Sequence, residues 1–129
     1  MKAALETFAN PEATRHYLIR HLAEEFTSVC PKTGQPDFGR VLLSYIPHES
    51  CLELKAYKHY LQGFRNEGIF YEAVTNRLLA DLTEACQPHW MRIETIWTPR
   101  GGIRSTLYTE YCAEGFTPGI VLPPLVSAV

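Results

Sequence analysis

Alternating apolar and polar positions predict four extended segments along the chain. The first two are Arg15 to Glu25, whose alternation is mixed on both faces, and Arg40 to Ile46. The other two, His89 to Thr98 and Ile103 to Cys112, flank the sequence Pro99-Arg100-Gly101-Gly102, which is typical of a hairpin connection. We therefore expect two strands in each half of the chain.

Apolar residues at helical spacing predict two consecutive helices between these strand pairs. The apolar face of the first helix consists of Tyr57, Tyr60, Leu61 and Phe64. Another face of this helix carries Lys55, Lys58, Gln62 and Arg65. The second helix begins after Gly68, ends before Pro88 and has an apolar face of Phe70, Ala73, Val74, Leu78, Leu82 and Ala85. This order predicts an α+β fold, an antiparallel four-stranded sheet with both helices on one face.

Length and composition fit one domain, residues 1–129, with its core at about residues 15–112. With 46% hydrophobic and 20% charged residues the chain can bury an ordinary core, yet it has no apolar run that approaches a membrane span. The N-terminus has no signal-peptide pattern, so we expect a cytoplasmic protein. A net charge of -2 argues against a nucleic-acid surface and favours a small-molecule partner.

The cysteines are widely spaced, which argues against a metal site. Cys30, Cys51, Cys86 and Cys112 form no CxxC pair and no short His/Cys cluster. Cys86 ends an apolar helical pattern and Cys112 lies in an alternating one, so we expect both to be structural. The role of Cys51, near a suspected site, stays open, including a disulfide that protects Cys30.

Cys30 differs from the other cysteines because turn-forming residues follow it. In Cys30-Pro-Lys-Thr-Gly-Gln-Pro-Asp37 a thiol and a carboxylate lie seven positions apart. A nucleophilic thiol must ionise, and Lys32 could lower its pKa. An ionised carboxylate beside the thiol would raise that pKa, so Asp37 suits a proton donor to the substrate. The alternative is a turn capped by Asp37 with an incidental thiol.

Charged residues near the helices have both a chemical and an ordinary interpretation. Lys55 and Lys58 could hold phosphates or form a solvated face, and no glycine-rich nucleotide fingerprint is present. Glu53 and Glu72 could favour helix starts or bind the donor edge of a purine-like base. Arg100 could be a hairpin cation or a phosphate contact. The histidines form no evident triad with the cysteine, which argues against a cysteine protease.

Four blocks together resemble the NADPH-dependent 7-cyano-7-deazaguanine reductases, the nitrile reductases of queuosine biosynthesis, a tRNA modification pathway. The resemblance covers about Phe26 to Tyr111 and looks like the short, single-module form. The blocks are EFTSVCPKTGQPDF at residues 25–38, ELKAYKHY at 53–60, FRN at 64–66 and TPRGG at 98–102.

The resemblance implies the tunnelling fold of GTP cyclohydrolase I, in which sheets of several subunits join into a barrel and the active sites form between subunits. A homo-oligomer of rings or stacked rings follows. By the same resemblance, Cys30 attacks the nitrile carbon to give a covalent thioimide and Asp37 protonates the nitrogen. Two NADPH molecules, as cosubstrate, then supply the hydrides that give the aminomethyl product.

The resemblance also implies roles for residues around the helices. NADPH contacts fall on Lys55, Lys58 and, more weakly, Arg100. Glu72 matches the glutamate that recognises the base, and the further substrate contacts are Leu52, Glu53, Leu54 and Tyr71. Tyr71 stands where the family often has histidine, and His59 where it more often has leucine or tyrosine.

Two rival functions remain beside the reductase. One is the related amidinotransferase, which attacks a nitrile already in tRNA without NADPH, and against which Lys55 and Lys58 argue. The other is a noncatalytic module that binds a purine or pterin, against which the intact Cys30 and Asp37 argue.

Overall fold

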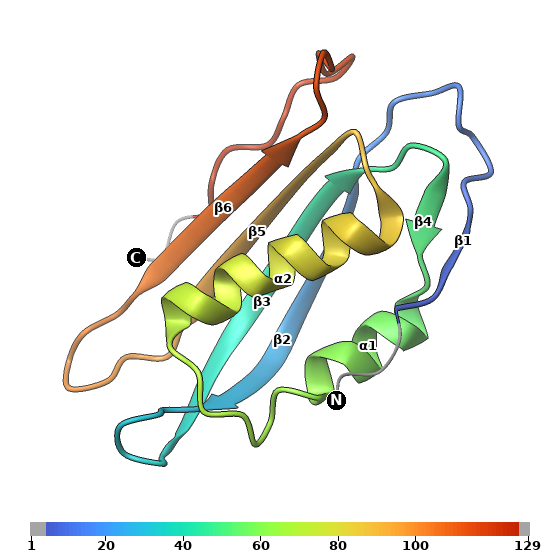
Figure 1. Cartoon of the computed structure of the whole chain (residues 1–129). Helices are drawn as coiled ribbons and strands as arrows, with labels where there is room; N and C mark the ends of the chain where they lie inside the picture. The colour runs from blue at the N-terminus through green and yellow to red at the C-terminus, as the bar shows by residue number, and fades with distance from the viewer. Residues whose placement is uncertain (1–4, 127–129) are drawn as a thin grey trace.

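A four-stranded antiparallel sheet is the centre of the structure, a computed structural model that describes residues 5–126. Its strands are β2 (Ile19–Val29), β3 (Pro36–Ile46), β5 (Trp90–Trp97) and β6 (Thr106–Cys112), side by side in the order β2-β3-β5-β6 (Figure 1). The sequence predicted these two strand pairs and their antiparallel arrangement, and both are confirmed.

Two helices, α1 (Leu54–Gln62) and α2 (Tyr71–Cys86), follow one another between the strand pairs. Both helices lie on one side of the sheet, and α2 runs along the strands at a slant (Figure 1). The apolar face predicted for the first helix is buried, and so are Val74, Leu78 and Leu82 of the second, whereas Phe70 and Ala73 are exposed, contrary to the prediction. The buried residues pack on inward residues of β3 and β5 such as Val41, Leu43, Met91 and Ile93. The α+β arrangement read from the sequence is therefore confirmed, although α1 ends before Phe64.

The strand ends differ from the sequence prediction in a way that matters for the site. Strand β2 extends to Val29 and β3 begins at Pro36, because the two strands regain their pairing after a register shift between Ala23 and Phe26. Asp37 therefore belongs to a strand, opposite Ser28, rather than to the loop.

Strand β6 also starts later than expected. Arg100 and Ile103 exchange backbone hydrogen bonds of 2.9 and 3.0 Å, and this tight turn delays the strand until Thr106.

A small second sheet pairs β1 (Thr7–Ala9) with β4 (Ser50–Leu52), and the sequence did not predict it. Each strand has three residues, too few for alternation to be visible. Cys51 lies in β4 with 2% of its surface exposed, and its sulfur is 3.8 Å from the Tyr17 hydroxyl oxygen.

The C-terminal tail covers the sheet face opposite the helices. Arg92 donates to the Pro123 carbonyl at 2.7 Å, and the Val126 backbone N–H donates to Glu94 at 2.6 Å. With the helices on one face and the tail on the other, every residue of β5 is buried, including the charged Arg92 and Glu94.

The two cysteines expected to be structural have different outcomes. Cys86 is buried as predicted, whereas Cys112 is exposed because the far half of β6 faces solvent, so that prediction is wrong. Neither helix within residues 5–126 has the length and apolar character needed to cross a membrane.

Candidate active site

Cys30 lies in a tight connection between β2 and β3 that its own backbone helps to close. The Cys30 N–H donates to the Gln35 carbonyl, and the Gly34 N–H donates to the Cys30 carbonyl, both at 2.9 Å. Gly34 has a φ of 72°, a conformation that glycine adopts without a steric penalty. The turn-forming sequence after Cys30 therefore builds a defined loop around the thiol.

The environment of Cys30 lowers the pKa of its thiol to about 7. The largest cause is a hydrogen bond from the Thr33 side chain, followed by the backbone of Thr33 and Lys32, with a smaller contribution from Arg100. Lys32 therefore acts through its backbone, whereas the sequence suggested a role for its side chain. A thiol with this pKa is about half ionised at neutral pH and is suited to nucleophilic attack.

Asp37 is the acid nearest this loop in sequence, and two donors hold one of its oxygens. The side chain is 5% exposed. Arg100 Nη1 donates to Asp37 Oδ1 at 2.7 Å, and the Tyr71 hydroxyl donates to the same oxygen at 3.2 Å. Burial, followed by the charge of Asp37, raises the pKa of Tyr71, so this phenol stays a donor.

A cavity of about 290 Å³ lies beside the thiol. Five of the residues predicted from the sequence line it together: Cys30, Asp37, Tyr71, Glu72 and Arg100. They come from the β2–β3 connection, β3, the first turn of α2 and the β5–β6 connection. The remaining lining is mainly apolar and consists of Pro31, Ile69, Phe70, Ile103 and Ser105.

Tyr71 is held in this cavity from behind by Trp97. The two rings are stacked, with centroids 4.0 Å apart and planes inclined by 8°. The Trp97 indole N–H in turn donates to the Thr95 hydroxyl at 3.0 Å. The phenol that stands in place of the family's frequent histidine is thus fixed in position.

The segment from Leu52 to Leu54 does not line this cavity. Leu52 is 3% exposed, whereas Leu54 is 58% exposed. Glu53 caps α1, because its carboxylate accepts the backbone N–H groups of Lys55 at 2.8 Å and Ala56 at 2.9 Å. These hydrogen bonds lower the pKa of Glu53, and they match the ordinary interpretation of this glutamate.

Lys55 and Lys58 are exposed on α1, three residues apart and hence on neighbouring positions of one helix face. Lys58 and Arg65 border a hollow of about 220 Å³ between α1 and β2, opposite Glu25. Two accessible ammonium groups a turn apart fit the phosphates of a dinucleotide, although neither lines the thiol cavity.

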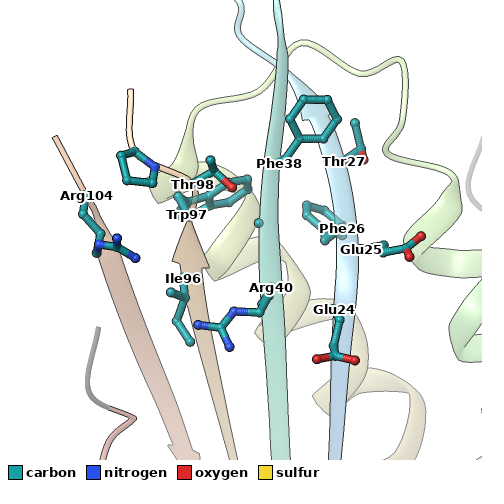
Figure 2. Close-up of a pocket in the computed structure, with 12 residues that line it drawn as sticks. Glu24, Glu25, Phe26, Thr27, Phe38, Arg40, Ile96, Trp97, Thr98 and Arg104 are labelled. Carbon is teal, nitrogen blue, oxygen red and sulfur yellow. The ribbon is translucent and has the colours of Figure 1, made fainter. Parts of the chain in front are cut away.

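A larger hollow, of about 490 Å³, lies elsewhere on the sheet. Figure 2 shows Arg40 on β3, Glu24 on β2, Ile96 on β5 and Arg104 bordering it. It contains no cysteine, so size alone does not identify the reactive site.

Thr33 is the residue that the sequence analysis missed. Its side chain contributes most to lowering the thiol pKa, and it also accepts a hydrogen bond from Arg100 Nη2 at 3.1 Å. A hydroxyl three residues after a loop cysteine was a usable signal, since serine and threonine side chains often bond within turns.

A family model described as QueF-like protein matches residues 36–115 of this chain. The chain belongs to the QueF-like protein family. Among its relatives, proteins named NADPH-dependent 7-cyano-7-deazaguanine reductase occur in several bacteria. That of Rhodopirellula baltica is 55% identical over 83% of this chain and 88% of its own length. That of Nitrosococcus oceani is 50% identical over 93% of this chain and 94% of its own length.

A solved structure confirms the family fold. The crystal structure of the archaeosine synthase QueF-Like in the apo form has a TM-score of 0.69, covering 78% of this QueF-like chain and 96% of the other. The sequences are 24% identical, so the likeness concerns the fold. It supports the tunnelling fold expected from the sequence.

Proposed function

We propose that this QueF-like protein is an NADPH-dependent 7-cyano-7-deazaguanine reductase, which reduces the nitrile of its substrate to an aminomethyl group. The observation that carries the proposal is a thiol with a pKa of about 7 and a buried carboxylate lining one cavity of about 290 Å³. The names of relatives about 50% identical over most of the chain support the same activity. The substrate is then a free deazapurine, converted in the cytoplasm.

The first step is the addition of the Cys30 thiol across the nitrile. The sulfur bonds to the nitrile carbon, one π bond of the nitrile breaks, and a proton reaches the nitrogen. The thiol proton moves to the Asp37 carboxylate, and Asp37 passes a proton to the nitrile nitrogen, so the thioimide contains all atoms of both reactants and Asp37 is again a carboxylate. The lowered pKa of Cys30 favours this step at neutral pH.

Reduction of the thioimide needs a hydride, which is the chemistry that NADPH supplies. Four electrons separate the nitrile from the amine, so two NADPH molecules are consumed. Lys55 and Lys58 hold the cofactor phosphates on the exposed face of α1. The thiol leaves after the first reduction, and Cys30 is regenerated for another cycle.

Recognition of the base falls to the start of α2. Glu72 lies in the first helical turn and lines the thiol cavity, where its carboxylate accepts from the ring N–H and exocyclic amine of the deazaguanine. Tyr71 fixes Asp37 through its hydroxyl and lines the same cavity.

An assembly of several subunits would give a role to the predicted substrate and cofactor contacts that lie outside this cavity. Leu52, Glu53, Leu54 and the two lysines then reach the substrate and cofactor of a neighbouring subunit across a multi-subunit barrel. The Leu54 side chain, which is 58% exposed, is available for such a contact.

Mass spectrometry with the nitrile substrate tests the proposal. The purified protein is incubated with 7-cyano-7-deazaguanine without NADPH, and we expect a covalent adduct on the peptide that contains Cys30. Added NADPH should then be oxidised, with a loss of absorbance, and the adduct should disappear. Cys30→Ala should form no adduct, with Cys112→Ala as the matched control because that thiol is exposed and outside the cavity.

The two rival functions give different results in this experiment. An adduct that NADPH does not discharge would contradict the reductase and favour the amidinotransferase. Binding without an adduct would favour the noncatalytic module.

A further inference from the structure

The hydrogen bonds of Thr33 determine the direction in which its hydroxyl proton points. Thr33 Oγ1 accepts from Arg100 Nη2 at 3.1 Å and from the Gln35 backbone N–H at 3.2 Å. A hydroxyl has two acceptor lone pairs and one proton. With both lone pairs engaged by donors, the proton is left to donate. The Cys30 sulfur, three residues earlier in the same loop, is the acceptor that agrees with the pKa of the thiol, because the Thr33 side chain is the largest cause of its lowering.

Arg100 joins this hydroxyl to the acid of the same site. One guanidinium nitrogen donates to Thr33 and another donates to Asp37 at 2.7 Å, although Arg100 is 67 and 63 residues away from them in sequence. A guanidinium is planar, so its two donors have a fixed relation to each other. Arg100 thereby sets the Thr33 hydroxyl and the Asp37 carboxylate in one geometry beside the thiol.

The two carboxylate oxygens of Asp37 differ in their hydrogen bonds. Oδ1 accepts from both Arg100 and Tyr71, whereas Oδ2 makes no side-chain hydrogen bond within residues 5–126. Oδ2 is therefore the oxygen that remains for proton exchange with thiol and substrate.

We propose that Arg100 is a positioning residue for thioimide formation, acting before any cofactor contact by orienting the Thr33 hydroxyl toward the Cys30 sulfur and by holding Asp37 Oδ1. This inference rests on the proposed reductase function. It goes further because the resemblance implies only a cofactor contact for Arg100, which would leave the covalent step untouched.

The chemistry of the step fits this role. Addition of the thiol to the nitrile needs no NADPH and no outside acid, because the thiol proton passes through Asp37 to the nitrile nitrogen. The donors around the sulfur stabilise the thiolate that attacks. Removing Arg100 should therefore slow the addition itself.

Other ionisable groups around the thiol must be considered in a pH profile. They come from every element that borders the cavity: Lys32 in the loop, Asp37 on β3, Tyr71 and Glu72 on α2, and Arg100 in the β5–β6 connection. Of these side chains, only that of Arg100 is named among the causes that lower the thiol pKa.

The test compares Arg100→Gln, Arg100→Lys and the control Arg104→Gln, an exposed arginine of the same connection outside the thiol cavity. Two quantities are measured without NADPH. The first is the pH dependence of iodoacetamide alkylation at Cys30, followed by peptide mass spectrometry. The second is the rate of adduct formation with 7-cyano-7-deazaguanine.

We expect the alkylation midpoint to rise in Arg100→Gln from the wild-type value of about 7. If the midpoint reaches about 8, the thiolate fraction at pH 7 falls about fivefold, and the adduct rate should fall at least as much. Arg100→Lys should recover part of the rate, since it restores the charge without the planar fork. Arg104→Gln should match the wild type.

The variant Thr33→Val distinguishes two ways in which Arg100 could act on the thiol: by positioning the Thr33 hydroxyl, or by its charge alone. If Arg100 acts through the hydroxyl, the effects of Thr33→Val and Arg100→Gln on the midpoint should not add in the double variant. Full additivity would contradict the hydroxyl route. The Arg100 side chain is 40% exposed, so these variants should fold, and circular dichroism verifies this.

The results that overturn the inference differ from those that overturn the reductase. An Arg100→Gln protein with wild-type alkylation and adduct rates but a raised KM for NADPH would make Arg100 a cofactor contact only. A wild-type protein that forms no adduct would end the proposed function, while the alkylation profiles would still decide whether Arg100 tunes the thiol.

Discussion

Gly39→Ala should disturb the site by displacing Trp97, the ring on which Tyr71 stacks, although Gly39 does not line the thiol cavity. Gly39 pairs with Phe26 on β2 and Trp97 on β5, and the rings of these two neighbours approach edge to face at 5.9 Å. A Cβ placed on Gly39 would lie 2.7 Å from Trp97 Cε3 and 3.0 Å from the Ile96 carbonyl oxygen. The first distance is shorter than a Cβ contact allows and the second is tight, so the Trp97 ring must move.

The size of the effect follows from where Trp97 is held. This ring is 1% exposed and bonded to Thr95, so it cannot move into solvent. Overpacking of this kind costs about 1–3 kcal/mol, which lowers the Tm by roughly 4–12 °C for a chain of this length. Because Tyr71 stacks on Trp97 and donates to Asp37, the adduct rate should fall as well.

Thermal denaturation of Gly39→Ala and Gly68→Ala, followed by circular dichroism, measures this prediction. Gly68 is the matched control, because a Cβ there would meet its nearest atom, Pro31 Cα, at an ordinary 3.6 Å. We expect the Tm of Gly68→Ala to stay close to that of the wild type. Equal Tm values for the two variants, or an unchanged adduct rate in a destabilised Gly39→Ala, would refute the reasoning.

Three further predictions concern the cofactor face, the acid stability and a buried hydroxyl. Lys58→Ala should raise the KM for NADPH severalfold and still form the adduct, and loss of the adduct would contradict its assignment to the cofactor. Burial and the charges of His48 and His16 lower the pKa of His89, so stability should be full above about pH 6.5 and fall with the pH below it. Urea midpoints between pH 5 and 7.5 measure this. Burial also lowers the pKa of His21, so part of the slope should remain in His89→Phe, and a slope as steep as that of the wild type would contradict the assignment. Ser28→Ala should not lower the Tm, because the buried Ser28 hydroxyl has no hydrogen-bond partner within residues 5–126, and a clear loss would show that the hydroxyl is bonded.

The sequence predicted the main elements because their hydrophobic periods are long. α2 begins after Gly68 and ends before Pro88, as the spacing of its apolar residues indicated. The short strands β1 and β4 and the covering tail were missed because their order depends on contacts with distant segments. Cys112 was assigned to the interior because alternation shows that a strand has two faces, but not which face is covered.

The site was predictable in its residues and less so in its contacts. The sequence and the family resemblance selected Cys30, Asp37, Tyr71, Glu72 and Arg100, and the structure brings these five residues to one cavity. The ion pair between Asp37 and Arg100 was not predicted, because it depends on how the start of β3 and the β5–β6 connection meet at one end of the sheet. The basic face of α1 was also predictable, but its distance from the thiol was not.

Backbone hydrogen bonds join the end of β2, next to Cys30, to the segment before α2, independently of the side chains in the cavity. The Val29 N–H donates to the Glu67 carbonyl, and the Ile69 N–H donates to the Val29 carbonyl, both at 3.0 Å. Only main-chain atoms make these bonds, so substitutions in the first turn of α2 leave them intact. Variants with altered choice of nitrile should therefore be obtainable by randomising positions 71 and 72 while the nucleophile keeps its place.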